Sequence, residues 1–231
     1  MGNTVTFNRP DGKSLSGYLA EPAAGARAPG IVVIQEWWGI NDQIRRVADR
    51  LAAQGYRALV PDLYRGKATV EAAEAEHLMK DLDFGDAAGQ DIRGAVQFLR
   101  EGGGPCGVVG FCMGGALTLL AAVHVPELDA AVVFYGYPPL EYVDAPKIRA
   151  PLMGHFSRDD AFFPIDGVRP LETKLREAIV EFEFHVYDAK HAFANETQVG
   201  EGKLLPVLEY DAAAAELAWS RTMDFLGRHL T

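Results

Sequence analysis

Residues 107–117 read Gly-Val-Val-Gly-Phe-Cys-Met-Gly-Gly-Ala-Leu, and this stretch decides the fold that we expect. An apolar run typical of a buried strand passes through a sharp turn into a helical segment. Such a turn brings strand and helix so close together that the residues two positions before and after its apex must lack bulk. Gly110 and Gly114 occupy these two positions. The stretch therefore predicts a nucleophile elbow with Cys112 at its apex.

The position of Cys112 also predicts a reactive thiol. The positive end of a helix dipole favours the thiolate, which is the nucleophilic form of cysteine. The backbone N–H of Met113 would supply one half of an oxyanion hole. An isolated motif of this kind is as typical of a small buried cysteine in a glycine-rich turn. The rest of the chain must decide between the two interpretations.

Short apolar strands and helical segments alternate on both sides of this turn. Ile31–Ile34 is continuously apolar, as expected for a strand covered on both faces, and the helical stretch Asp42–Gln54 follows it. Further predicted strands are Arg57–Val60, Gly107–Gly110, Ala130–Phe134, Leu152–His155 and Phe182–Val186. Repeated strand–helix units predict about eight strands in a mostly parallel sheet with helices on both faces. The ligand site of such a sheet lies beyond the carboxyl ends of its strands.

The two ends of the chain complete this single predicted domain, which spans residues 1–231. Thr4–Phe7 and Leu15–Leu19 flank the turn residues Pro10–Lys13, which predicts an antiparallel hairpin at one edge of the sheet. A last helix is expected over Asp211–Leu230. We expect one stripe of it to pack against the sheet, made of Ala215, Ala218, Trp219, Thr222, Leu226 and Leu230.

Composition and charge exclude several classes of partner. A formal net charge of −10 and a pI near 5.1 would repel a phosphate backbone, so we expect no nucleic acid partner. No apolar run approaches the roughly 20 residues that cross a bilayer, so we expect a soluble cytoplasmic protein without a membrane partner. We also expect a monomer or weak homodimer. Cys106 and Cys112 are poorly placed for a disulfide, and no closely spaced Cys/His set predicts a metal. No cofactor is required.

Candidate partners for the thiol follow later strands. In a fold with this elbow, the nucleophile, the acid and the histidine occur in that order along the chain. Asp160 lies in a polar turn closed by Pro164, where Asp159 is the competing candidate. His191 follows the last strand and the predicted turn Tyr187–Lys190, and it would act first as general base and then as general acid.

The other histidines receive a plainer interpretation. We expect His77, His124, His185 and His229 to be satisfied by solvent, without a catalytic role. His155 lies near the end of its strand, where it could approach the site or be a buried polar residue, and it stays unassigned.

Five motifs follow one another along the chain: Gln35-Glu36-Trp37-Trp38-Gly39, Pro61-Asp62-Leu63-Tyr64, Gly110-Phe111-Cys112-Met113-Gly114-Gly115, Asp160-Ala161-Phe162-Phe163-Pro164 and His191-Ala192-Phe193-Ala194-Asn195. In this order they resemble the dienelactone hydrolase (carboxymethylenebutenolidase) family of the α/β-hydrolase superfamily. The resemblance spans almost the whole chain and implies an α/β-hydrolase fold with a Cys112, Asp160 and His191 triad. It also implies that Glu36 lies close to the thiol and influences its ionisation, and that the backbone N–H of Trp37 is the second oxyanion donor.

The sequence departs from the family where two arginines bind a substrate carboxylate. One of these positions falls near Ala72, and the other matches Asn195. Neither residue can replace a bidentate arginine, so the resemblance leaves the physiological substrate open. Arg65, Lys67 and Lys190 are the candidates that could compensate.

These observations favour hydrolysis of a small ester or lactone through an acyl-enzyme on Cys112. Aromatic and polar side chains near the motif ends are candidates for the substrate pocket, namely Trp38, Phe111, Tyr135, Phe162, Phe193 and Asn195. Two alternatives remain open: a non-catalytic module that binds small ligands on the same scaffold, and a thiol that senses redox state.

Overall fold

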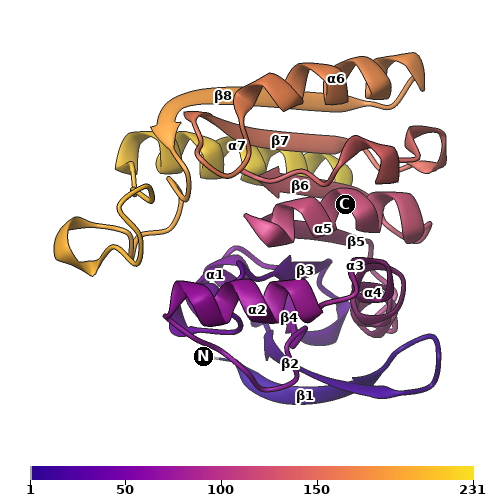
Figure 1. Ribbon diagram of the computed structural model, residues 1–231. Helices are drawn as coiled ribbons and strands as arrows, with labels where there is room; N and C mark the ends of the chain where they lie inside the picture. The colour runs from indigo at the N-terminus through magenta and orange to yellow at the C-terminus, as the bar shows by residue number, and fades with distance from the viewer. Residues whose placement is uncertain (1) are drawn as a thin grey trace.

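The computed structural model describes residues 2–231, and its centre is an eight-stranded sheet (Figure 1). Across the sheet the strands lie in the order β1-β2-β4-β3-β5-β6-β7-β8. The pairs β1–β2 and β2–β4 are antiparallel, and the other five pairs are parallel. The predicted α/β fold with a mostly parallel sheet is therefore confirmed. The strands are β1 (Asn3–Asn8), β2 (Ser14–Ala20), β3 (Gly30–Ile34), β4 (Arg57–Pro61), β5 (Cys106–Phe111), β6 (Ala130–Phe134), β7 (Leu152–Asp159) and β8 (Phe182–Lys190).

Helices cover both faces of the sheet, as predicted. The helices α1 (Asp42–Ala53) and α7 (Ala212–His229) pack on one face, and their bounds lie within two residues of the predicted ones. The other face carries α4 (Arg93–Arg100), α5 (Met113–His124) and α6 (Val168–Glu177). Two further helices are α2 (Ala72–Asp81) and the short α3 (Phe84–Asp86). Within residues 2–231, no helix is both long enough and apolar enough to cross a bilayer.

Two apolar cores, one on each face of the sheet, explain why the central strands are continuously apolar. Val32 and Ile34 of β3 point into the core under α4, α5 and α6. Ile31 and Val33 of the same strand point into the core under α1 and α7. Successive side chains of a strand alternate between faces, so a strand covered on both sides needs apolar residues at every position. The predicted apolar stripe of α7 is buried along its full length.

The last strand differs from the prediction. The turn expected at Tyr187–Lys190 is absent, because β8 continues to Lys190 and His191 follows it directly. Tyr187 and Ala189 are buried whereas Asp188 and Lys190 are exposed. This alternation is typical of a strand with one face exposed to solvent. The polar residues that suggested a turn are the outward-facing half of this pattern.

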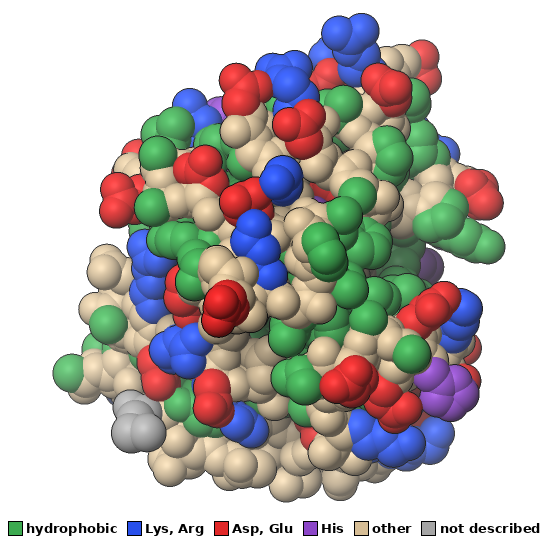
Figure 2. Space-filling view, turned by 60° about the vertical axis from the view of Figure 1, so that its left-hand side comes forward, with side chains coloured by type: hydrophobic (Ala, Val, Ile, Leu, Met, Phe, Trp, Pro, Cys, Tyr) green, Lys and Arg blue, Asp and Glu red, His purple; other side chains and the backbone are tan. Residues whose placement is uncertain are grey.

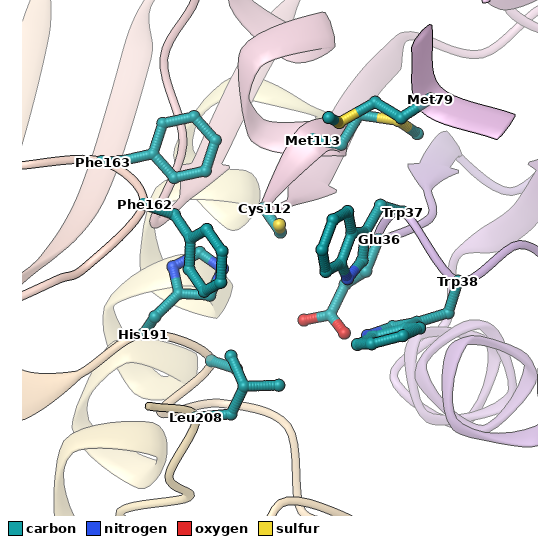
Figure 3. Close-up of a pocket in the computed structure, with 11 residues that line it drawn as sticks. Glu36, Trp37, Trp38, Met79, Cys112, Met113, Phe162, Phe163, His191 and Leu208 are labelled. Atoms are coloured by element: carbon teal, nitrogen blue, oxygen red, sulfur yellow. The ribbon is translucent and has the colours of Figure 1, made fainter. Parts of the chain in front are cut away.

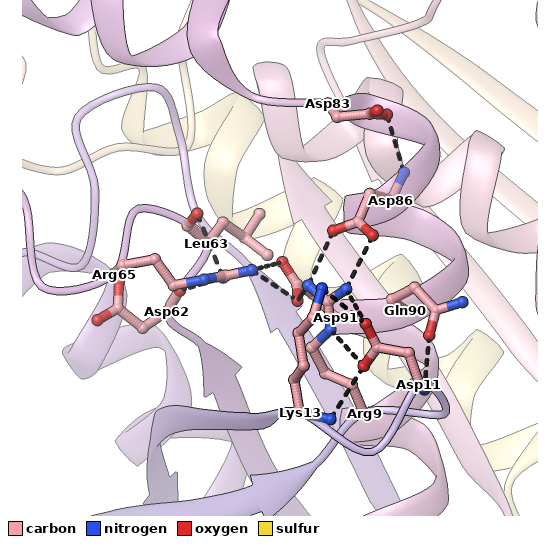
Figure 4. A network of polar contacts seen from close by, with 10 residues as sticks. All are labelled: Arg9, Asp11, Lys13, Asp62, Leu63, Arg65, Asp83, Asp86, Gln90 and Asp91. Atoms are coloured by element: carbon pink, nitrogen blue, oxygen red, sulfur yellow. Dashed lines mark hydrogen bonds and ion pairs between the residues drawn. The ribbon is translucent and has the colours of Figure 1, made fainter.

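A network of charged residues attaches the β1–β2 hairpin to the segment after α2 (Figure 4). Arg9 donates to Asp11, to Asp86 and, at 2.8 Å, to Asp91. Asp91 also accepts from Arg65 at 3.0 Å. The side chains of Arg9 and Asp91 are only 5% and 1% exposed, so this ion pair is shielded from water. The network ties together three segments that are distant in the sequence.

Candidate active site

Cys112 lies at the turn between β5 and α5, at the carboxyl end of the sheet. Its φ of 56° and ψ of −119° are strained for a residue with a side chain, as expected at the apex of a nucleophile elbow. The backbone N–H of Cys112 donates to the carbonyl oxygen of Phe134 at 3.0 Å, which ties the turn to β6. A Cβ at Gly110 would overlap the carbonyl oxygen of Gly114, so the close approach of strand and helix requires glycine there.

Asp160 and His191 form a buried hydrogen-bonded pair. The Nδ1 atom of His191 lies 2.8 Å from Oδ2 of Asp160. The same carboxylate accepts from the hydroxyl of Ser157 and from the backbone N–H groups of Phe162 and Phe163. Burial alone would raise the pKa of Asp160, but the bonds and charge from His191 and the two backbone N–H groups outweigh it and lower that pKa. Asp160 therefore stays ionised and orients the imidazole.

The geometry also distinguishes Asp160 from its neighbour. Asp159 is the last residue of β7, its side chain is exposed, and its ladder partner is Lys190. Of the two candidates that the sequence left open, only Asp160 bonds to His191.

His191 is poised as a cation beside the thiol. Burial by itself would lower the pKa of His191, but the negative charge of Cys112 and hydrogen bonds with Asp160 and Cys112 raise it to about 10. Because Nδ1 is occupied by Asp160, the other ring nitrogen, Nε2, is left for the sulfur. The arrangement places a protonated imidazole beside the sulfur of Cys112.

Glu36 reaches the same pocket from the end of β3. Its Oε2 accepts from the amide Nδ2 of Asn195 at 2.8 Å, and its Oε1 accepts from the hydroxyl of Tyr135 at 3.2 Å. Burial raises the pKa of Glu36, and the charge of His191 and these hydrogen bonds oppose the rise only in part. Asn195 and Tyr135, which the sequence predicted as substrate contacts, instead hold this buried carboxyl group in place.

The two predicted oxyanion donors are unpaired. Within residues 2–231, neither the backbone N–H of Trp37 nor that of Met113 has a hydrogen-bond acceptor. Met113 is the first residue of α5, where the N–H has no partner inside the helix, and Trp37 lies in the turn after β3. Both groups are free to bind an oxygen of a ligand.

A cavity of about 170 Å³ surrounds these groups (Figure 3). Of the predicted substrate contacts, Trp38 and Phe162 line it, together with Glu36, Cys112 and His191. Sequence reasoning did not select four further lining residues, Met79, Phe163, Ala192 and Leu208. Phe163 and Ala192 lie inside quoted motifs and could have been chosen, whereas Met79 of α2 and Leu208 carry no local signal.

Two predicted substrate contacts belong to the core. Phe111 is 1% exposed and stacks on Phe134 with ring centroids 4.7 Å apart, and Phe193 is fully buried against Tyr187. Neither lines the cavity, because the residue just before the nucleophile points into the sheet face under α7. A position next to a catalytic motif therefore does not place a side chain on the cavity wall.

His155, which the sequence left unassigned, is also a core residue. It is fully buried, and its two ring nitrogens bond to the hydroxyls of Tyr187 at 2.9 Å and Thr222 at 3.0 Å. Burial lowers the pKa of His155 well below its usual value, so the ring is neutral. Of the two interpretations left open for His155, the structure shows the buried polar residue, and its partners are side chains.

None of the candidate basic residues compensates for the missing arginines. Arg65 bonds to Asp91, and Lys190 pairs with Glu209 at 2.5 Å. Among the described residues, no Lys or Arg lines the cavity around Cys112, and Lys67 lies outside it. The wall of this cavity therefore presents no guanidinium or ammonium group to a substrate carboxylate.

Known proteins of one family match almost the whole chain. The sequence pattern of the dienelactone hydrolase family matches residues 15–230. The protein usf of Aquifex pyrophilus is 34% identical over 242 residues, which covers 100% of both chains, and a carboxymethylenebutenolidase of Pseudomonas putida is 33% identical over 236 residues, covering 96% of this chain and 94% of its own. The crystal structure named "Putative Dienelactone Hydrolase" from Klebsiella pneumoniae superposes with a TM-score of 0.81 at 27% identity and covers 99% of both chains.

Proposed function

Because the chain belongs to the dienelactone hydrolase family, we propose that it hydrolyses small carboxylic esters or lactones through a thioester formed on Cys112. The observation that carries this proposal is the buried Asp160–His191 pair beside a cysteine at the apex of a strained elbow. This combination supplies a nucleophile, a proton carrier and a group that orients the carrier.

The first step is attack of the Cys112 thiolate on the carbonyl carbon of the substrate. A carbon–sulfur bond forms while the carbonyl π electrons move to oxygen, and the free N–H groups of Trp37 and Met113 stabilise that oxyanion. When the oxyanion collapses, the carbon–oxygen bond to the alcohol breaks and the imidazolium of His191 gives its proton to the departing alkoxide. The products are an alcohol, or the new hydroxyl of an opened lactone, and a thioester.

The second step reverses these roles with water as the nucleophile. Neutral His191 takes a proton from water while the hydroxide oxygen bonds to the thioester carbon. Collapse of this second oxyanion expels the Cys112 thiolate and releases the carboxylic acid. The thiolate–imidazolium pair is restored, with Asp160 holding the imidazole throughout.

Single-turnover mass spectrometry tests this mechanism directly. A short-chain activated ester and a small unsaturated lactone are each mixed with the wild-type protein and with the Cys112→Ser and Cys112→Ala variants. We expect a mass increase equal to the acyl group on the wild-type peptide that contains Cys112, and no adduct on the alanine variant. Turnover that is unchanged in Cys112→Ala would refute the thiol mechanism. An unreactive thiol with neither adduct nor turnover would favour a ligand-binding module.

A further inference from the structure

A large apolar groove adjoins the cavity around Cys112. Its volume is about 740 Å³, compared with about 170 Å³ for the cavity itself. Met79, Met113 and Phe163 line both, so the groove and the cavity meet at these side chains. The space-filling view shows hydrophobic side chains gathered around a hollow on this side of the molecule (Figure 2). A ligand held at Cys112 therefore has a much larger space beside it than its reacting group needs.

The lining of the groove favours a hydrocarbon chain. Ala116 and Leu120 of α5 lie on it, as do Phe84 of α3 and the aromatic rings of Tyr137 and Tyr142. Its polar lining side chains include Asp83 and His124, and among the described residues no Lys or Arg contributes to it. Apolar walls stabilise buried methylene groups, whereas a carboxylate in this groove would lose its hydration without gaining a cationic partner.

The position of the groove relative to His191 decides which half of an ester it takes. In the close-up, His191 and Leu208 lie on one side of Cys112, and Met79 and Met113 lie on the other (Figure 3). The alcohol must depart on the side of His191, because it receives its proton from that ring. Three residues form the entrance to the groove. Met79 and Met113 lie across Cys112 from His191, whereas Phe163 stacks on the His191 ring with centroids 5.6 Å apart. The acyl group then extends along the two methionines, on the side of the entrance away from His191.

We infer that the groove is an acyl-binding site, and that the substrates of this enzyme are uncharged esters with a long apolar acyl group. This inference rests on the proposed function and specifies its substrate class. The continuity of the groove with the cavity around the nucleophile identifies the occupant as part of the substrate.

Two series of esters test which half of the substrate the groove takes. In one series the acyl chain lengthens from acetyl to decanoyl with ethanol as the alcohol, and in the other the alcohol lengthens with acetyl as the acyl group. Hydrolysis of both is followed by pH-stat. A methylene group transferred from water to an apolar site is worth about fourfold in kcat/KM, so we expect about this rise per carbon in the acyl series until the groove is filled. We expect little change in the alcohol series.

A charge introduced at the rim distinguishes binding in the groove from general hydrophobic attraction. Tyr142 is 61% exposed on the rim, so Tyr142→Glu leaves the packed core intact and places a carboxylate at the groove. Leu217→Glu is the matched control, because Leu217 is 47% exposed on α7 and lies outside the groove. We expect Tyr142→Glu to lower the ratio of kcat/KM for the longest acyl chain to kcat/KM for the acetyl ester at least tenfold, whereas Leu217→Glu leaves both values as in the wild type.

Binding of methyl ketones of increasing chain length, measured by calorimetry, separates the groove from the chemistry. We expect Kd to fall about fourfold per methylene group and this dependence to weaken in Tyr142→Glu. If no ester is hydrolysed but the ketones behave in this way, the proposed function fails and the apolar-chain site stands. The acyl-site inference is overturned if kcat/KM depends on the length of the alcohol and not of the acyl chain, or if the Kd of the ketones does not depend on their length. It is also overturned if Tyr142→Glu converts a dimer into monomers without changing the chain-length dependence.

Discussion

The nucleophilic role that we propose for Cys112 rests on features supplied by different parts of the chain. The elbow fixes its positive φ, α5 begins at the next residue with the N–H of Met113 unpaired among the described residues, and His191 supplies a positive charge. Asp160 completes the arrangement by holding the imidazole through a 2.8 Å hydrogen bond. The chemistry proposed at one sulfur atom therefore depends on the ends of several strands.

The first residue-scale prediction compares two adjacent carboxylates. Asp160→Asn should lower kcat about 10³-fold to 10⁴-fold, because loss of an orienting carboxylate has this effect in related triads. Asp159→Asn is the control, and its kcat should stay within about twofold, since an exposed side chain away from the site contributes little. Steady-state kinetics of the two variants with one ester would make the comparison, and equal losses would remove Asp160 from its proposed role.

The second residue-scale prediction concerns the protonation of His191. Its imidazole should titrate near pH 10 in the wild-type protein, because the charge of Cys112 and the bond to Asp160 stabilise the protonated ring. Cys112→Ala removes the negative charge and should shift this titration to lower pH. Imidazole resonances followed by NMR would show it, with His191→Gln used to assign the signal. Identical titrations in both proteins would contradict a charged thiolate partner.

The raised pKa of His191 also determines how the stability of the fold depends on pH. The folded pKa of His191 is raised above its unfolded value of about 6.5, so the fold favours the protonated ring. This contribution to stability is fully present below pH 6.5 and is lost as pH rises through about 10.

At the scale of elements, the elbow and the end of β8 set the positions of Cys112 and His191. The strand β5 passes into α5 through a single residue, Cys112. The strand β8 pairs with β7 as far as Lys190, after a register shift, and His191 is the next residue. Both elements end at the same edge of the sheet. Their lengths therefore determine whether imidazole and thiol meet.

The element-scale prediction concerns the glycine before the apex. Gly110→Ala should destabilise the protein by about 1–3 kcal/mol, because the added Cβ overlaps the backbone of Gly114 and forces α5 away from β5. Gly227→Ala on α7 is the matched control: no atom lies within 4 Å of its added Cβ, and the change should stabilise the helix by about 0.5–1 kcal/mol. Urea denaturation would measure both, and a neutral Gly110→Ala would show that the elbow is loosely packed.

At the scale of the whole molecule, two cores and a buried ion-pair network hold the site in place. The sheet separates the cores, and the three residues of the proposed triad lie along the edge where its parallel strands end. Arg9 and Asp91 connect the antiparallel hairpin to the helices of one face, far from the thiol in the sequence. Their contribution should appear in stability and leave the chemistry unchanged.

The whole-molecule prediction removes one partner of that buried pair. Arg9→Met should destabilise the fold by about 3 kcal/mol, because a buried carboxylate that loses a cation keeps the cost of its desolvation. Lys147→Ala is the control: it breaks an exposed pair with Asp144, and a change below about 1 kcal/mol is expected. Urea denaturation gives both values, while kcat of the folded Arg9→Met protein should match that of the wild type. A loss similar to that of the control would mean that Arg65 alone satisfies Asp91.

The sequence by itself determined what depends on local spacing. The alternation of apolar strands and helices, the elbow at Cys112 and the chain order of Asp160 and His191 could all be predicted, because strand period, turn chemistry and connection rules act over a few residues.

Only the tertiary structure decided which side chains share a space. It selected Asp160 over Asp159, assigned Asn195 and Tyr135 to Glu36, and moved Phe111 and Phe193 into the core. Met79 and Leu208 joined the cavity in the same way. Contacts between segments up to 159 residues apart, as between Asn195 and Glu36, depend on how the layers pack, and no local pattern encodes that packing.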